Sequence, residues 1–239
     1  TILGFNTPVN HEFPLEIKRE KKHPGTQPKN LVILMIESLT TKYVDSLSNN
    51  NYKVTPKLDR LVHEGVAFVN FFASGQRSVD GIQSIVTGVP PLPGMPDITS
   101  LSVNYSRLAK LAETNGYQHI FITTTRRESF WLDAIAAAAG FSKYYGKEDI
   151  PILLDYPNAR DRPLGWDYEA LMYLLQRLEG MQAPYFAFVN ASADHTPFVE
   201  LQPPFNQYEH GSDTEGGYLN MLHYTDWAIG EFIEKFKDR

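Results

Sequence analysis

The 239-residue chain contains no cysteine. This absence excludes disulfide bonds, thiolate metal sites and cysteine nucleophiles, and it suits an oxidising, extracytoplasmic setting. Long apolar runs are also missing, since none approaches the roughly 20 residues that a transmembrane helix needs. The first residues lack the pattern of a secretory signal peptide. We therefore expect a soluble piece of a longer protein.

Positive charge is scarce as well. The chain has 22 Lys and Arg residues against 28 Asp and Glu residues, which gives a net charge of -6. Non-specific nucleic-acid binding needs a basic face, so we expect no nucleic-acid partner. Residues 1–29 hold four prolines and a charge run at 18–22, a composition typical of a linker or surface strap. The run is either a solvated face or a basic strap beside an anionic membrane.

Residues 30–239 alternate short apolar runs with amphipathic segments. This order favours an α/β fold, a three-layer α/β/α sandwich with a mostly parallel central sheet. The predicted strands cover residues 31–36, 66–72, 117–124 and 185–190. The predicted helices cover residues 55–64, 78–87, 106–115, 133–139, 166–178 and 215–237.

Glu37 ends the first apolar run, residues 31–36. Six consecutive apolar residues indicate a strand buried on both faces, and open parallel sheets carry their chemistry just beyond the carboxyl ends of such strands. An ionised carboxylate at that point needs a partner. Two interpretations remain open: Glu37 belongs to a functional site, or it caps the following turn or pairs with a surface base.

Ser78 stands where the predicted strand 66–72 turns into a helix, on the same rim as Glu37. A serine at a helix start is ordinarily an N-cap. The backbone N–H groups at a helix N-terminus also form an anion site. A nucleophilic hydroxyl there would lie beside N–H groups that can bind the oxygens of a phosphoryl or sulfuryl group.

Two further polar loops follow predicted strands on this rim. The loop after residues 117–124 carries Arg126, Arg127 and Trp131, and it is either an anion-binding loop or a surface loop anchored by a partly buried tryptophan. The loop after residues 185–190 carries Asp194 and His195. A lone histidine is usually structural, whereas an Asp-His pair beside a phosphate-sized site is typical of a ligand, an acid or a base.

Four segments in this order resemble the sulfatase-like branch of the alkaline phosphatase superfamily, and most closely the lipoteichoic acid synthase group of phosphoglycerol transferases. The resemblance spans about residues 29–239, and the segments that carry it are residues 30–38, 55–58, 71–80 and 194–198. It implies an extracytoplasmic enzyme, anchored in a membrane by segments outside this chain. The implied substrate is an anionic phosphate or sulfate ester, with a lipid-linked donor as one form.

The resemblance also implies roles for individual residues. Glu37 would be a metal ligand, Ser78 both a metal ligand and the nucleophile of a covalent seryl intermediate, and His195 a substrate contact. The implied metal is a divalent ion, Mn²⁺ in preference to Mg²⁺, and oxygen ligands suit both ions. Asp194 and Trp131 are expected to help bind the substrate.

The chain departs from this group in two places. Trp131, Leu132 and Asp133 stand where the group has Trp-Asn-Arg, whose arginine holds the substrate phosphate, so Arg126 or Arg127 is expected to substitute. The group's remaining metal ligands form a Gly-Asp-His motif beyond the last helix. Asp194 and His195 come too early to be that pair. We therefore expect the catalytic domain to lack its C-terminal part here, with half of the metal site.

Two alternatives remain beside the phosphoryl transferase or hydrolase. A true sulfatase converts a cysteine or serine to formylglycine within a Cys/Ser-x-Pro-x-Arg signature, and residues 78–82 lack that proline and arginine. A non-catalytic binding domain with an incomplete metal site is the alternative from another class.

Overall fold

The computed structural model describes residues 27–100, 102–157, 162 and 164–237. The linker or strap expected over residues 1–29, with its basic run, lies outside these residues except for its last three positions. The centre is a four-stranded sheet in the order β1-β4-β2-β3, and all neighbouring strands are parallel. The strands are β1 (Leu31–Ile36), β2 (Gln118–Thr123), β3 (Tyr144–Tyr145) and β4 (Tyr185–Ala191).

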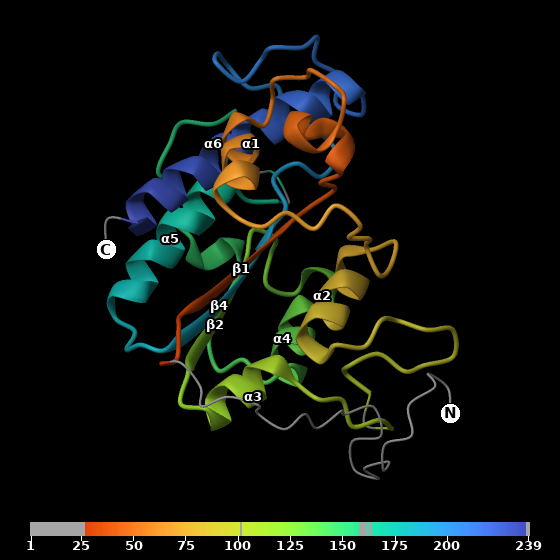
Figure 1. Ribbon diagram of the computed structural model, residues 1–239, viewed down its shortest axis with the longest axis vertical. Helices are drawn as coiled ribbons and strands as arrows, with labels where there is room; N and C mark the ends of the chain where they lie inside the picture. Colours follow the sequence, from red (N-terminus) through yellow and green to blue (C-terminus); the bar gives the residue numbers. More distant parts are fainter. Residues whose placement is uncertain (1–26, 101, 158–161, 163, 238–239) are drawn as a thin grey trace.

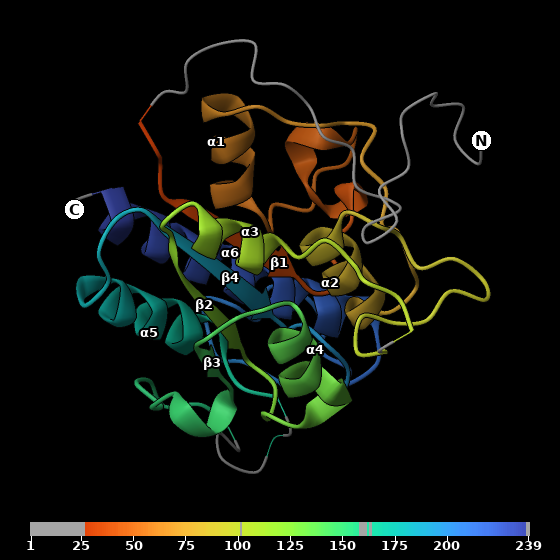
Figure 2. The ribbon, with the colours of Figure 1, turned by 90° about the horizontal axis from the view of Figure 1, so that it is seen from below.

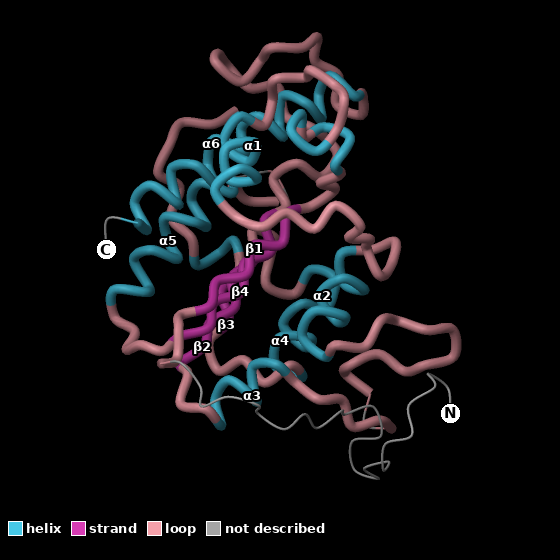
Figure 3. Tube along the Cα trace, viewed as in Figure 1, coloured by secondary structure: helices cyan, strands magenta, loops and turns pink. Residues whose placement is uncertain are grey.

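Helices cover both faces of the sheet, so the predicted three-layer sandwich with a parallel sheet is confirmed (Figure 1, Figure 3). One layer contains α5 (Asp167–Glu179) and α6 (Glu215–Lys237), and the opposite layer contains α2 (Ser78–Thr87), α3 (Leu108–Thr114) and α4 (Leu132–Ala138). The remaining helix, α1 (Pro56–Glu64), packs on α6 and lies near two short 3-10 helices, η1 (Thr41–Tyr43) and η2 (Asp45–Leu47) (Figure 2). Within the described ranges, no helix combines the length and the apolar character needed to cross a membrane.

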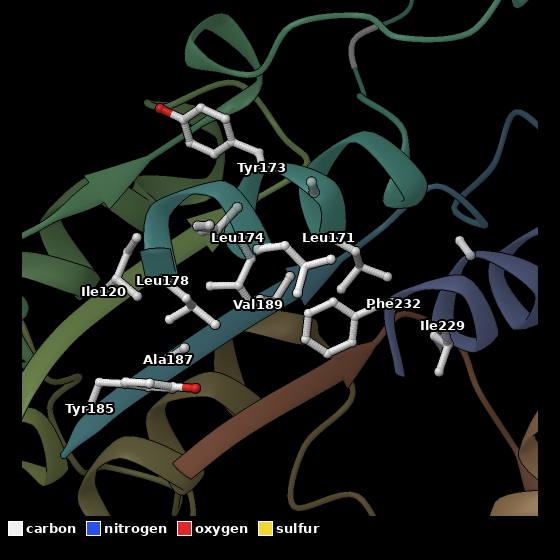
Figure 4. Packing of buried hydrophobic residues seen from close by; sticks show 14 residues of the cluster. Ile120, Leu171, Tyr173, Leu174, Leu178, Tyr185, Ala187, Val189, Ile229 and Phe232 are labelled. Carbon is white, nitrogen blue, oxygen red and sulfur yellow. The ribbon is translucent and has the colours of Figure 1, made fainter. Parts of the chain in front are cut away.

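Each face of the sheet has its own hydrophobic core, because successive strand residues point to opposite faces. Ala187 and Val189 of β4 pack against the leucines of α5 and against Phe232 of α6 (Figure 4). Phe186 and Phe188, which alternate with them, pack against α2, α3 and α4. The sheet thereby fixes where the carboxyl ends of β1, β2 and β4 lie relative to both helical layers.

The start of α1 depends on a carboxylate from another helix. Pro56 occupies the first helical position, where proline is favoured, but Thr55 makes no capping hydrogen bond. The buried Asp226 of α6 instead accepts hydrogen bonds from the backbone N–H groups of Lys57, at 2.9 Å, and Leu58, at 2.8 Å. Asp226 thus satisfies two N–H groups that a helix start leaves free.

The prediction of a strand at residues 66–72 is wrong, because this segment is an exposed loop. A strand needs a neighbour that binds its backbone groups, and among the described strands β1 pairs only with β4. Because β1 has a described neighbour on one side only, it is an edge strand. Its residues are only partly buried, so the expectation that this strand is buried on both faces is wrong. The five large apolar side chains of the loop are 69% to 83% exposed: Val66, Phe68, Val69, Phe71 and Phe72.

Candidate active site

Glu37 and Ser78 come from different elements and meet at the carboxyl ends of the strands. Glu37 directly follows β1, and its backbone N–H donates to the carbonyl of Ala191 at 2.9 Å, which extends the pairing of β1 with β4 by one residue. Ser78 is the first residue of α2, and its hydroxyl donates a hydrogen bond to Glu37 Oε2. The other carboxylate oxygen accepts from the Ser38 hydroxyl at 3.2 Å.

A glycine of α2 lies where the helix approaches β1. A Cβ atom at Gly81 would lie 3.2 Å from Met35 Cε of β1, tighter than ordinary packing allows. A larger residue would require the end of the Met35 side chain or this turn of α2 to shift by a few tenths of an ångström. Ser78 precedes Gly81 by less than one turn of the helix, so the hydroxyl lies on the part of α2 that is close to β1.

The pair opens into a cleft with a volume of about 850 Å³. His195 and Trp131 also line it, so the structure brings four predicted site residues to one cavity. The sequence analysis missed several other lining residues, among them Arg77, Asp97, Thr99, Phe130, Asn190 and Ser192.

Arg77 and Asp97 bring opposite charges to this cleft. Arg77 immediately precedes Ser78, a position that could have drawn attention to it in the sequence, and its guanidinium lies 3.3 Å from Asp80. The Thr99 hydroxyl donates to Asp97 at 2.5 Å and holds the pKa of that carboxyl below its ordinary value. Among the described arginines, Arg77 is the one that lines the cleft beside Ser78.

His195 follows β4 in a turn closed by its own N–H, which donates to the carbonyl of Ser192 at 3.2 Å. Its ring atom Nδ1 lies 2.7 Å from the carbonyl oxygen of Thr196. A carbonyl only accepts, so Nδ1 carries the proton. The neutral ring therefore presents Nε2 as an acceptor, and Nε2 can donate a proton only when the ring is charged.

Asp194 lies behind the cleft rather than in its lining. The side chain is fully buried, and neither carboxylate oxygen has a hydrogen-bond partner among the described residues. Burial raises the pKa of Asp194 well above its ordinary value, the negative charges of Asp167 and Glu37 raise it further, and Arg162 opposes them. The side chain is thus held close to the site without facing it.

Arg126 and Arg127 are not among the residues that line the cleft. Arg126 lines a separate cavity of about 370 Å³, together with Trp166 and Glu169. Arg127 forms an ion pair with Asp149 at 2.5 Å. Neither guanidinium is placed in this structure to replace the arginine missing after Trp131.

Comparison with protein-family models identifies the family of this chain. The family model described as Sulfatase matches residues 29–239. The chain belongs to the sulfatase family. The resemblance seen in the sequence is thereby confirmed.

Known proteins that are similar to this chain are longer than the part that matches it. The chain is 20% identical over 219 residues to the lipoteichoic acid synthase-like protein YvgJ of Bacillus subtilis strain 168, covering 88% of this chain and 34% of YvgJ. The crystal structure of an alkaline phosphatase superfamily protein from Vibrio parahaemolyticus superposes with a TM-score of 0.75 at 28% identity, covering 89% of this chain and 51% of that one. The chain thus spans about a third of the curated relative and about half of the solved one.

The lipoteichoic acid synthase LtaP from Listeria monocytogenes shares the fold of this chain. Its crystal structure superposes with a TM-score of 0.68 at 24% identity, covering 88% of this chain and 52% of that chain.

The chemistry of Glu37 and Ser78 fits part of a site for a divalent metal. Carboxylate and hydroxyl oxygens are donors that hard cations such as Mg²⁺ and Mn²⁺ accept, and the contact between the two side chains brings one of each together. In the part of the chain that the structure describes, no group of three or more His, Asp or Glu residues could hold an ion. The pair would supply two oxygen ligands, and a complete site needs more.

Proposed function

We propose that the whole protein transfers or hydrolyses a phosphoryl ester, phosphoglycerol or a related head group, through a covalent intermediate on Ser78. The single observation that carries the proposal is the hydrogen bond from the Ser78 hydroxyl to Glu37, in a cleft that His195 also lines. The similarity to a lipoteichoic acid synthase-like protein favours phosphoglycerol, in a lipid-linked donor. The corresponding location is the outer face of a membrane or the periplasm, with the anchor outside this chain.

In the first step, Ser78 Oγ attacks phosphorus in line. The Oγ–P bond forms while the bond from phosphorus to the leaving alcohol oxygen breaks. The hydroxyl proton, which points at Glu37, passes to Oε2 of that carboxylate as the Oγ–P bond forms. The leaving oxygen takes a proton from Nε2 of charged His195, since Nδ1 is committed to Thr196. Arg77 attracts the anionic ester into the cleft.

In the second step, an acceptor alcohol or water attacks the phosphoserine. Neutral His195 accepts the proton of the attacking oxygen at Nε2, and the Oγ–P bond breaks. Ser78 recovers its proton from Glu37. An alcohol acceptor gives transfer and water gives hydrolysis, so the access of each to the cleft decides the outcome.

Glu37 and Ser78 would also hold a divalent metal, Mn²⁺ in preference to Mg²⁺. When bound, such an ion lowers the pKa of the serine hydroxyl and offsets negative charge on the phosphoryl oxygens. Its remaining ligands would come from outside the described residues.

The test is Ser78→Ala in the full-length protein, assayed for phosphodiester turnover with Mn²⁺. The expected loss is about 10³-fold or more, the size typical for a missing nucleophile. Ser84→Ala is the matched control, because Ser84 lies on the same helix and its hydroxyl donates to the carbonyl of Asp80 at 2.8 Å. The control should stay within about twofold of the wild type. Retained turnover in Ser78→Ala would remove Ser78 as the nucleophile.

Sulfuric ester hydrolysis is a second candidate, because the family model is that of sulfatases. This chemistry would require Ser78 to be oxidised to formylglycine. The mass of the peptide that contains Ser78 separates the two proposals, since formylglycine is lighter than serine by two hydrogen atoms. An unmodified serine supports the phosphoryl ester.

A further inference from the structure

The turn that carries His195 contains the buried Asp194 and lies against the buried side chains of Arg162 and Asp167. Arg162 is 6% exposed, and Asp167 and Asp194 are fully buried. Moving charges out of water carries a large desolvation cost, so a buried ion cluster is a poor source of stability. Stability alone therefore does not account for this cluster.

Two of these side chains bind the backbone of the turn directly. Asp167, the first residue of α5, accepts a hydrogen bond from the Ala193 N–H at 3.1 Å. Arg162 Nη2 donates to the carbonyl of Ala193 and, at 3.4 Å, to the carbonyl of His195. Both backbone groups of Ala193 and the carbonyl of His195 are thus held by buried charges.

The binding side chains are themselves anchored to the helical layer. The second carboxylate oxygen of Asp167 accepts from the Thr225 hydroxyl of α6 at 2.7 Å. The Arg162 guanidinium lies 5.0 Å from the ring centre of Trp166, and its Nη1 donates to the carbonyl of Gly165 at 3.5 Å. The turn is therefore tied to α5 and α6 in addition to β4.

The orientation of the His195 ring follows from that of its backbone. Nδ1 is bonded to the carbonyl of Thr196, the next residue, so a displaced turn would carry the ring with it. We propose that Arg162 and Asp167 are positioning residues, which fix the backbone of residues 193–195 and thereby aim His195 into the cleft. The proposal rests on the proposed function only where turnover is the readout.

The kinetic test is a double-mutant cycle in the full-length protein. Asp167→Ala is expected to lower kcat/KM by about 10- to 100-fold when His195 is present, mainly through kcat, and by less than about twofold when His195 is already alanine. An equal loss in both backgrounds would mean that Asp167 acts on the fold in general and would overturn the proposal.

Asp226 provides a matched control for Asp167. It is also a buried carboxylate in the same helical layer, and it accepts two backbone hydrogen bonds, from Lys57 and Leu58. Burial raises the pKa of both carboxyls to about 6. Asp226→Ala should destabilise the protein, and any loss in kcat/KM should be the same whether residue 195 is histidine or alanine. If Asp226→Ala, like Asp167→Ala, lowered kcat/KM much more when His195 is present, the positioning role of Asp167 would be contradicted.

A second readout does not depend on turnover. The imidazole nitrogen signals of His195, assigned by comparison with His195→Ala, should shift in Arg162→Lys, since lysine keeps the charge but not the forked donors. Asp167→Asn keeps an oxygen acceptor for Ala193 and should leave the signals near those of the wild type, as should Asp226→Asn. Unchanged signals in Arg162→Lys would overturn the proposal even if Asp167→Ala does not fold. A shift in a protein that lacks turnover would support positioning while the proposed function fails.

Discussion

Ser78 donates a hydrogen bond to Glu37 across 41 positions of the sequence. Regular structure fixes both partners: Glu37 continues the pairing of β1 with β4, and Ser78 begins a helix whose Gly81 lies against Met35 of β1. The contact therefore belongs to the frame of the fold. Sites on rigid elements hold their geometry better than sites on loops.

Glu37→Gln should weaken Mn²⁺ binding by about tenfold or more, because the amide has the same shape but lacks the negative charge that a hard cation prefers. The measurement is calorimetric titration of the full-length protein with Mn²⁺. Glu215→Gln serves as the control, since Glu215 pairs with Lys42 at the surface.

An equal affinity in Glu37→Gln would contradict the role of Glu37 as a ligand. If the wild-type protein shows no binding at all, the alternative of a non-catalytic binding domain is favoured.

Phe130→Gly should stabilise the protein while weakening substrate binding. Phe130 has φ 57° and is 60% exposed in the lining of the cleft. A left-handed backbone is unfavourable by about 1–2 kcal/mol for a residue with a Cβ atom, and the extra entropy of glycine in the unfolded chain offsets about half of this gain. The expected net gain is about 0.5–1 kcal/mol, measured by chemical denaturation, together with a higher KM.

Phe72→Gly is the control for this prediction, because Phe72 is exposed but does not have a positive φ. It should give no gain in stability. A loss of stability in Phe130→Gly would show that the ring contributes packing that outweighs the backbone strain.

His119 should make the protein less stable in acid. The ring is buried beside Phe141, its Nδ1 accepts from the Ser142 N–H at 3.3 Å, and burial lowers its pKa. The unfolded chain then binds a proton more readily than the folded one, so the contribution of His119 is complete above about pH 6.5 and is lost as the pH falls.

The measurement is the free energy of unfolding between pH 8 and pH 5 for the wild type and for His119→Gln, whose amide oxygen can accept from Ser142. The variant should show the flatter pH dependence. Parallel curves would contradict a neutral buried histidine.

The sequence was sufficient to predict the three layers of the fold and to place the candidate site at the carboxyl ends of the strands. Apolar runs with polar residues at their carboxyl ends predicted β1, β2 and β4, and this rule led to Glu37 and His195. Ser78 was found partly through a strand at residues 66–72 that does not form. Its place beside Glu37 comes from the start of α2, which was predicted independently.

The parts that the sequence analysis missed depend on contacts between distant segments. The apolar pattern of residues 66–72 shows which side chains alternate, but a strand forms only beside a partner. Arg162 and Asp167 act on backbone groups about 30 positions away, and no local pattern marks such a contact. Arg126 and Arg127 were attractive by position, yet one lines another cavity and the other pairs with Asp149.

The most direct test is mass spectrometry of the peptide that contains Ser78, after the full-length protein is mixed with a phosphodiester substrate and Mn²⁺ and quenched during turnover. The account predicts a phosphoryl adduct on Ser78 in the wild type and in Ser84→Ala, and none in Ser78→Ala. Turnover that proceeds with Ser78 unmodified at every quench time would contradict it.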